Sequence, residues 1–178
     1  MNSYILLGVT LCVSFAAVID VFTQKIPNWL TLPSMAVGLC LNFWFFGSTG
    51  LFSSAQGLLV GFGLLFLVYR LGGMGGGDVK LLAAVGAFVG PRMVFYSFIW
   101  MALVGGVLAI LLIAYKKAFG QTLQNLKLLL MGWLLQTHSG DANLTIKNQA
   151  LLKLPYGVAI ALGTILAVFL RQIPRFGF

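Results

Sequence analysis

Stretches of mostly apolar residues, long enough to cross a lipid bilayer, recur along this chain of 178 residues. A membrane-spanning helix needs about 20 such residues. Hydrophobic residues make up 60% of the chain and charged residues 8%, whereas a soluble domain carries about a quarter charged residues. The sequence therefore predicts an all-α membrane protein: one domain over residues 1–178, built as a polytopic bundle of about six transmembrane helices. We place the spans at residues 3–20, 29–46, 53–71, 79–90, 93–115 and 154–171.

The fourth of these segments is too short to cross a bilayer alone. Only the stretch Val79 to Val89 precedes Gly90-Pro91, and at 1.5 Å per residue it reaches about half of the roughly 30 Å hydrocarbon core. We expect neighbouring helices to shield it, or the helix to continue past Pro91 with a kink. Residues 118–136 carry early polar side chains, which favours a helix lying on the membrane over a seventh span.

The net charge of +8 comes from eleven Lys and Arg against three acidic residues. In a chain this apolar, we expect the basic residues to meet anionic lipid headgroups and not nucleic acid. Basic loops mark the cytoplasmic side of a membrane protein. With the N-terminus outside, the cytoplasmic side holds Lys25, Arg70, Lys80, Lys116, Lys117, Lys127, Lys147 and Lys153, and the outer side Arg92, Arg171 and Arg175. This orientation also puts Asp20 and Asp78 near the cytoplasmic face.

Acidic residues are so scarce that their positions are informative. The chain has three Asp and no Glu; Asp141 falls in a polar loop, while Asp20 and Asp78 fall at the edges of spans. An Asp within a span costs about 2.5–3.5 kcal/mol, so it usually has a function or a partner. The plain alternative to function is a pair of ion pairs, to Lys25 and Lys80. After Asp20, Ile26-Pro27-Asn28 predicts the start of the next helix and a short, ordered loop.

Glycine surrounds the approach to Asp78. Five of the six residues before it, from Gly72 to Gly77, are glycine. Such a run permits a positive φ and lets another backbone come close, as an extended peptide substrate requires. A phosphate-binding loop would end in Gly-Lys-Ser/Thr, whereas this one ends in Gly-Asp, whose carboxylate repels phosphate.

Two carboxylates held together supply what amide hydrolysis needs without a metal or a nucleophile. Close to one another they cannot both ionise, so they share a proton; one acts as general base toward water and the other as general acid. Other chemistries are poorly supplied: the single histidine is His138, and Cys12 and Cys40 form no paired motif. We expect no metal and no cofactor.

Three motifs together resemble the prepilin peptidase, or type IV leader peptidase, family of aspartyl proteases. Gly75-Gly76-Gly77-Asp78 matches the GxGD motif, and Val79-Lys80-Leu81-Leu82 extends the likeness. Asp20 followed by Lys25-Ile26-Pro27-Asn28 is similar to the family's other aspartate motif, and Leu154-Pro155-Tyr156-Gly157 to its last one. The chain looks most like the short forms linked to Flp/Tad pili.

The resemblance implies a membrane endopeptidase that removes leaders from prepilin or pseudopilin precursors at the cytoplasmic face. It implies Asp20 and Asp78 as the catalytic pair. It also implies residues that shape the site or bind substrate: Gly75, Gly76, Gly77, Lys80, Lys25, Pro155, Tyr156 and Gly157. The N-terminal extension of larger, N-methylating members is not expected, and neither is methylation. The oligomeric state stays open.

Two other functions fit parts of the pattern. A small proton-coupled transporter would also use two membrane aspartates, but it would more often place them near the midplane and show an internal repeat. A non-catalytic assembly partner in a pilus machine could keep both aspartates. Loss of cleavage in Asp20→Asn and Asp78→Asn would separate the peptidase from both.

Overall fold

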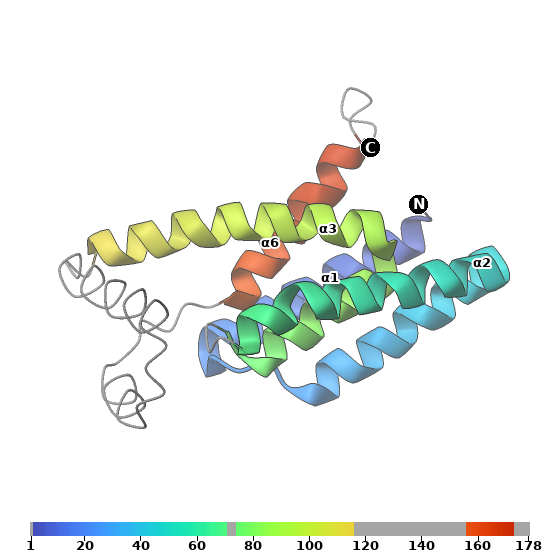
Figure 1. The fold of residues 1–178 in the computed structure, drawn as a ribbon, viewed down its shortest axis with the longest axis horizontal. Helices are drawn as coiled ribbons and strands as arrows, with labels where there is room; N and C mark the ends of the chain where they lie inside the picture. Colours follow the sequence, from blue (N-terminus) through green and yellow to red (C-terminus); the bar gives the residue numbers. More distant parts are fainter. Residues whose placement is uncertain (1, 71–73, 116–155, 173–178) are drawn as a thin grey trace, which may run out of the picture. The chain divides into compact units, whose positions relative to one another are not determined.

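The computed structural model describes residues 2–70, 74–115 and 156–172, and the regular structure in these ranges is helical. In chain order the helices are α1 (Ser3–Thr23), α2 (Asn28–Arg70), α3 (Gly76–Tyr115) and α6 (Tyr156–Gln172) (Figure 1). α1, α2 and residues 76–112 of α3 are long and apolar enough to cross a membrane, and α6 is a shorter apolar helix. These helices agree with the predicted all-α membrane protein.

The chain divides into two compact units, residues 1–105 with 155–178 and residues 106–154. The described part of the second unit, residues 106–115, is the end of α3. Every contact discussed below lies within the first unit. The single domain over residues 1–178 stays a prediction, and the helix expected at 118–136 lies outside the described residues.

Two glycines with positive φ break the long helices. Gly47 in α2 has φ 63° and ψ −147°, and Gly90 in α3 has φ 81° and ψ 176°. Side chains are strained in this backbone region, whereas glycine is not. At Gly47, α2 turns back on itself (light blue to teal in Figure 1). The four resulting helical stretches match the predicted segments from 29 to 115; that each one crosses the membrane stays a prediction.

The stretch of α3 before Gly90 is enclosed by protein, as its shortness predicts. Each residue from Leu81 to Val85 is 0% exposed. Residues of α1 and of both halves of α2 contact it, through Gly8 at Phe88, Gly38 at Ala87 and Gly61 at Leu82. A helix shielded on every side does not have to match the thickness of the lipid.

Glycine residues, which have no side chain, allow the neighbouring helices to pack closely around this stretch of α3. Gly57 of α2 and Gly86 of α3 meet backbone to backbone, so that a Cβ on either would collide with the carbonyl group of the other. Small residues at helix contacts let backbones approach and gain van der Waals attraction, which drives helix association in lipid. Gly57 is therefore a packing residue of the enclosed stretch.

Side chains of α2 complete the hydrogen bonding at the Gly90 break. Asn42 Nδ2 donates to the carbonyl oxygens of Ala87 and Phe88, each at 3.0 Å, and Ser54 Oγ also donates to the Ala87 carbonyl. Pro91 has no N–H with which to continue the helical pattern. An unpaired carbonyl in apolar surroundings is costly. These bonds hold the end of the enclosed stretch at a defined depth.

Replacing Gly57 by alanine tests this packing. Because the new methyl group meets backbone that cannot move aside, Gly57→Ala should lower the free energy of unfolding by about 1–3 kcal/mol, the usual cost of overpacking. Thermal unfolding in a lipid nanodisc measures the change.

Gly63→Ala is the matched control on the same helix, since nothing lies within 4 Å of a Cβ there. It should be neutral, or stabilising by up to about 1 kcal/mol through helix propensity. Equal stability changes in the two variants would contradict the packing assigned to Gly57.

Candidate active site

Asp20 lies in the last turn of α1 with its side chain turned into the protein. The residue is 5% exposed. Its Oδ2 accepts a hydrogen bond of 2.7 Å from the backbone N–H of Gly157, the second residue of α6. The first N–H groups of a helix have no partner within the helix and carry partial positive charge, so they bind anions well. The start of α6 thus provides a site for the Asp20 carboxylate.

Asp78 lies in the first turn of α3 and is equally enclosed. It is 7% exposed, and its Oδ2 accepts a 3.1 Å hydrogen bond from the Gly75 N–H. In return the Asp78 N–H donates to the Gly75 carbonyl at 3.2 Å. A carboxylate in the first turn of a helix is stabilised by the helix dipole. Each carboxylate is therefore bound at the start of a helix. The Asp20 carboxylate is bound at the start of α6, and the Asp78 carboxylate at the start of α3, its own helix.

The end of α1 and the starts of α3 and α6 come together (Figure 1). The carboxylates of Asp20 and Asp78 lie at this place. The charge of Asp20 acts on Asp78, and the charge of Asp78 acts on Tyr156, which adjoins the Gly157 that binds Asp20. The expectation that both aspartates lie at the same side of the bundle agrees with this geometry.

The predicted alternative, in which Lys25 and Lys80 form ion pairs with the aspartates, is wrong. Lys80 Nζ donates to Asn28 Oδ1 at 2.8 Å, and Lys25 is exposed. Within residues 2–70, 74–115 and 156–172, no cationic side chain bonds to either carboxylate. Residues two apart on a helix do not face one another, which keeps Lys80 away from Asp78. Among the described residues, the two aspartates thus form a buried acidic pair without a cationic partner.

The three glycines before Asp78 have different surroundings. A Cβ on Gly75 would lie 3.2 Å from Asp78 Oδ2, and a Cβ on Gly77 would lie 2.8 Å from the Ile26 carbonyl oxygen. A Cβ on Gly76 would make only ordinary contact with Tyr69, at 3.7 Å. The first and third glycines thus have close neighbours and the middle one does not. Among the described glycines, positive φ occurs at Gly47 and Gly90. The three glycines before Asp78 therefore do not serve to adopt a positive φ.

The predicted C-terminal motif contributes through its backbone. Besides donating to Asp20, Gly157 has no room for a side chain, because a Cβ would lie 2.9 Å from Asp20 Cβ and Oδ2. Tyr156 is half-buried beside it. Pro155 lies outside the described residues.

Sequence reasoning missed two residues of the site. Ile26 is 8% exposed and its backbone lies against Gly77, and Asn28 is the partner of Lys80. Both belong to the Ile26-Pro27-Asn28 string, which the sequence presented as a helix start and as part of an aspartate motif, without a role for either residue. Asn28 is the first residue of α2, and its side-chain oxygen accepts the lysine.

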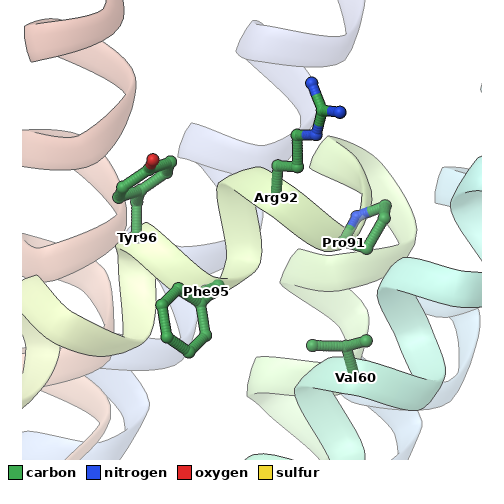
Figure 2. Close-up of a pocket in the computed structure, with 5 residues that line it drawn as sticks. All are labelled: Val60, Pro91, Arg92, Phe95 and Tyr96. Atoms are coloured by element: carbon green, nitrogen blue, oxygen red, sulfur yellow. The ribbon is translucent and has the colours of Figure 1, made fainter. Parts of the chain in front are cut away.

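Other features of the described residues lie away from this chemistry. They include no group of three or more His, Cys, Asp or Glu side chains that could hold a metal. A hollow of about 320 Å³ lies between α2 and the part of α3 after Gly90 (Figure 2). Its walls are formed by Val60, Pro91, Arg92, Phe95 and Tyr96, and none of these is a predicted site residue.

Comparison with known proteins identifies the family. The sequence model of the type IV leader peptidase family matches residues 7–110, which include both aspartates. The chain belongs to the type IV leader peptidase family. No solved structure matches the chain significantly.

Curated relatives of this chain carry consistent names. A prepilin leader peptidase/N-methyltransferase of Neisseria gonorrhoeae is 36% identical over 152 residues, covering 76% of this chain and 50% of the relative. The protein of that name from Escherichia coli K12 is 41% identical over 81 residues, covering 42% and 36%. A prepilin peptidase of Methanothermobacter thermautotrophicus is 34% identical over 99 residues, covering 49% and 24%. The chain matches half or less of the length of these relatives.

Gly157→Ala tests whether the bond from the Gly157 N–H to the Asp20 carboxylate matters for the activity expected of this family. The added methyl group would push the carboxylate off the Gly157 N–H, and a displacement near 1 Å can cost up to about 100-fold in rate. We expect peptide cleavage to fall at least about 10-fold.

Gly105→Ala is the control, because its Cβ would make ordinary contact with Ala159 of α6, at 3.5 Å. It should cleave at the normal rate. Normal cleavage by Gly157→Ala would show that the position of the Asp20 carboxylate at Gly157 does not matter for the reaction.

Proposed function

We propose that this chain is a membrane-embedded aspartyl endopeptidase in which Asp20 and Asp78 form the catalytic pair. It hydrolyses the leader from type IV prepilin-like precursors at the cytoplasmic face of the inner membrane. Support comes from family membership, from the names of the relatives, and from the geometry of the two carboxylates.

One observation carries the proposal: two buried aspartates converge with no cation beside them in the described residues. A structural carboxylate in an apolar interior is normally paired with a cation. Here each receives one backbone N–H, which stabilises a negative charge without removing the carboxylate's ability to take up a proton. That combination suits a pair that holds one proton between two oxygens.

The chemistry follows from one shared proton. The charged carboxylate takes a proton from a water molecule as the water oxygen attacks the scissile carbonyl carbon. The protonated carboxyl group gives its proton to the carbonyl oxygen, so that a neutral tetrahedral intermediate forms. When the C–N bond breaks, the nitrogen takes up the proton of the carboxyl group that acted as base and leaves as the new amino terminus. One hydroxyl group of the intermediate gives its proton to the other carboxylate as the new carboxyl group forms, so that the pair again holds one proton.

The position of the pair along α1 fits a cut at the membrane surface. Asp20 lies 17 residues beyond Ser3, which is about 26 Å along a helix, close to the full thickness of the hydrocarbon core. With the N-terminus outside and six spans, the pair lies at the cytoplasmic boundary. A leader that ends just before an apolar helix would present its scissile bond at this depth. The Flp/Tad-type precursor is the substrate that the sequence resemblance favours.

The proposal predicts the result of single replacements in protein reconstituted with a prepilin-like substrate. Asp20→Asn and Asp78→Asn keep the shape of each side chain but cannot share a proton. Each should lower cleavage by at least about 100-fold, as expected for loss of general acid–base catalysis. Gel analysis of the released leader measures the rate.

Asp141→Asn is the matched control, since it removes the remaining acidic residue of the chain, and it should cleave normally. Thermal unfolding should show that all three variants are folded. Cleavage that survives in either Asp20→Asn or Asp78→Asn would remove that residue from the catalytic pair.

A further inference from the structure

The hydrogen bonds that the two carboxylates accept do not connect α1, which carries Asp20, to α3, which carries Asp78. Asp20 on α1 is bonded to α6, and Asp78 on α3 is bonded to Gly75, just ahead of its own helix. The separation of the carboxylates therefore depends on another connection between the end of α1 and the start of α3.

The connection is the short linker from α1 to α2. Its first residue, Gln24, follows the end of α1 at Thr23, and with φ 51° it donates its N–H to the Asp20 carbonyl at 2.8 Å. This bond fixes the start of the linker to the turn that carries Asp20. Ile26 then places its backbone and Cβ against Gly77 of α3, in the space that a side chain would otherwise fill. The linker thus touches α3 at the residue preceding Asp78.

A hydrogen bond lies close to this contact, between the residue two positions after Ile26 and the residue three positions after Gly77. Lys80 Nζ donates to Asn28 Oδ1 at 2.8 Å, which joins the second turn of α3 to the first residue of α2. Lys80 carries a charge, and such charge-assisted bonds are shorter and stronger than neutral ones. Because Lys80 bonds to Asn28, it connects α3 to α2 and does not neutralise Asp20 or Asp78.

We propose that Asn28 and Lys80 are positioning residues that set the distance between Asp20 and Asp78. This inference rests on the proposed role of the aspartate pair. Neither residue takes part in proton transfer; they act by holding the first two turns of α3 against the linker that leaves Asp20.

Kinetics on the intact protein in nanodiscs test the inference. Lys80→Met and Asn28→Leu each remove the bond and should lower kcat by about 10- to 100-fold, the scale of a misplacement near 1 Å. KM should stay within twofold, because substrate binding is untouched. The double variant should be no slower than the slower single variant, and Lys80→Arg, which keeps a cationic donor, should recover most of the rate.

Arg92→Met is the control for loss of one positive charge from the same helix, and it should leave kcat unchanged. Asn28→Ser, too short to reach Lys80, replaces Asn28→Leu if leucine at this exposed position prevents folding. Unchanged kcat in the single variants would overturn the inference, as would an effect on KM alone or additive losses in the double variant.

A second readout does not depend on activity. In a variant with Asp20→Cys and Asp78→Cys, and with Cys12→Ala and Cys40→Ala to remove the native thiols, a short bis-maleimide should join the two new thiols. Adding Lys80→Met should slow this joining severalfold. An equal rate with and without Lys80 would overturn the positioning role. If instead Asp20→Asn and Asp78→Asn cleaved normally while Lys80→Met slowed the joining, the proposed function alone would fail.

Discussion

Two carboxylates lie buried at one end of an apolar helical bundle, and no cation neutralises them within the described residues. Water is largely excluded, so each charge must be met by fixed dipoles. The protein meets this need with backbone N–H groups at Gly157, on the free start of α6, and at Gly75, ahead of α3. The chain therefore has to bring a helix end and two helix starts to the same place, and much of the remaining structure serves that convergence.

The stretch of α3 that carries Asp78, which ends at Gly90, is held at both of its ends and along its sides. It is short, and α1 and both halves of α2 surround it, so it forms the core of the bundle and does not face lipid. Glycine contacts set how closely its neighbours approach, and Asn42 and Ser54 bind its far end where Gly90 breaks the helix. The near end is held by Ile26 and by the bond from Lys80 to Asn28. Such constraint suits the proposed catalytic pair, whose two carboxylates have to keep a constant separation.

The sequence predicted the helices and singled out the two aspartates, because the free energy of placing a residue in or beside lipid depends on the local sequence. Long apolar runs define the spans, and an Asp beside a span is expensive enough to imply a use. The shortness of the fourth segment, residues 79–90, also predicted that neighbouring helices would enclose it. Contacts across helices could not be predicted in this way. Whether Lys80 bonds to an aspartate or to Asn28 depends on which faces meet, and local spacing does not determine that. The contact between Ile26 and Gly77 likewise appears only once the linker is placed beside α3.

The central claim is that Asp20 and Asp78 hold one proton as a pair, and the composition of the chain makes this directly measurable. With three Asp and no Glu, protein labelled with ¹³C at the aspartate carboxyl carbon gives three side-chain signals, which can be followed by NMR as the pH is changed. The account predicts that the signals of Asp20 and Asp78 titrate as a coupled pair, so that replacing either one by Asn changes the titration of the other, while Asp141 titrates alone. Three independent titrations, with Asp78 unaffected by Asp20→Asn, would contradict it.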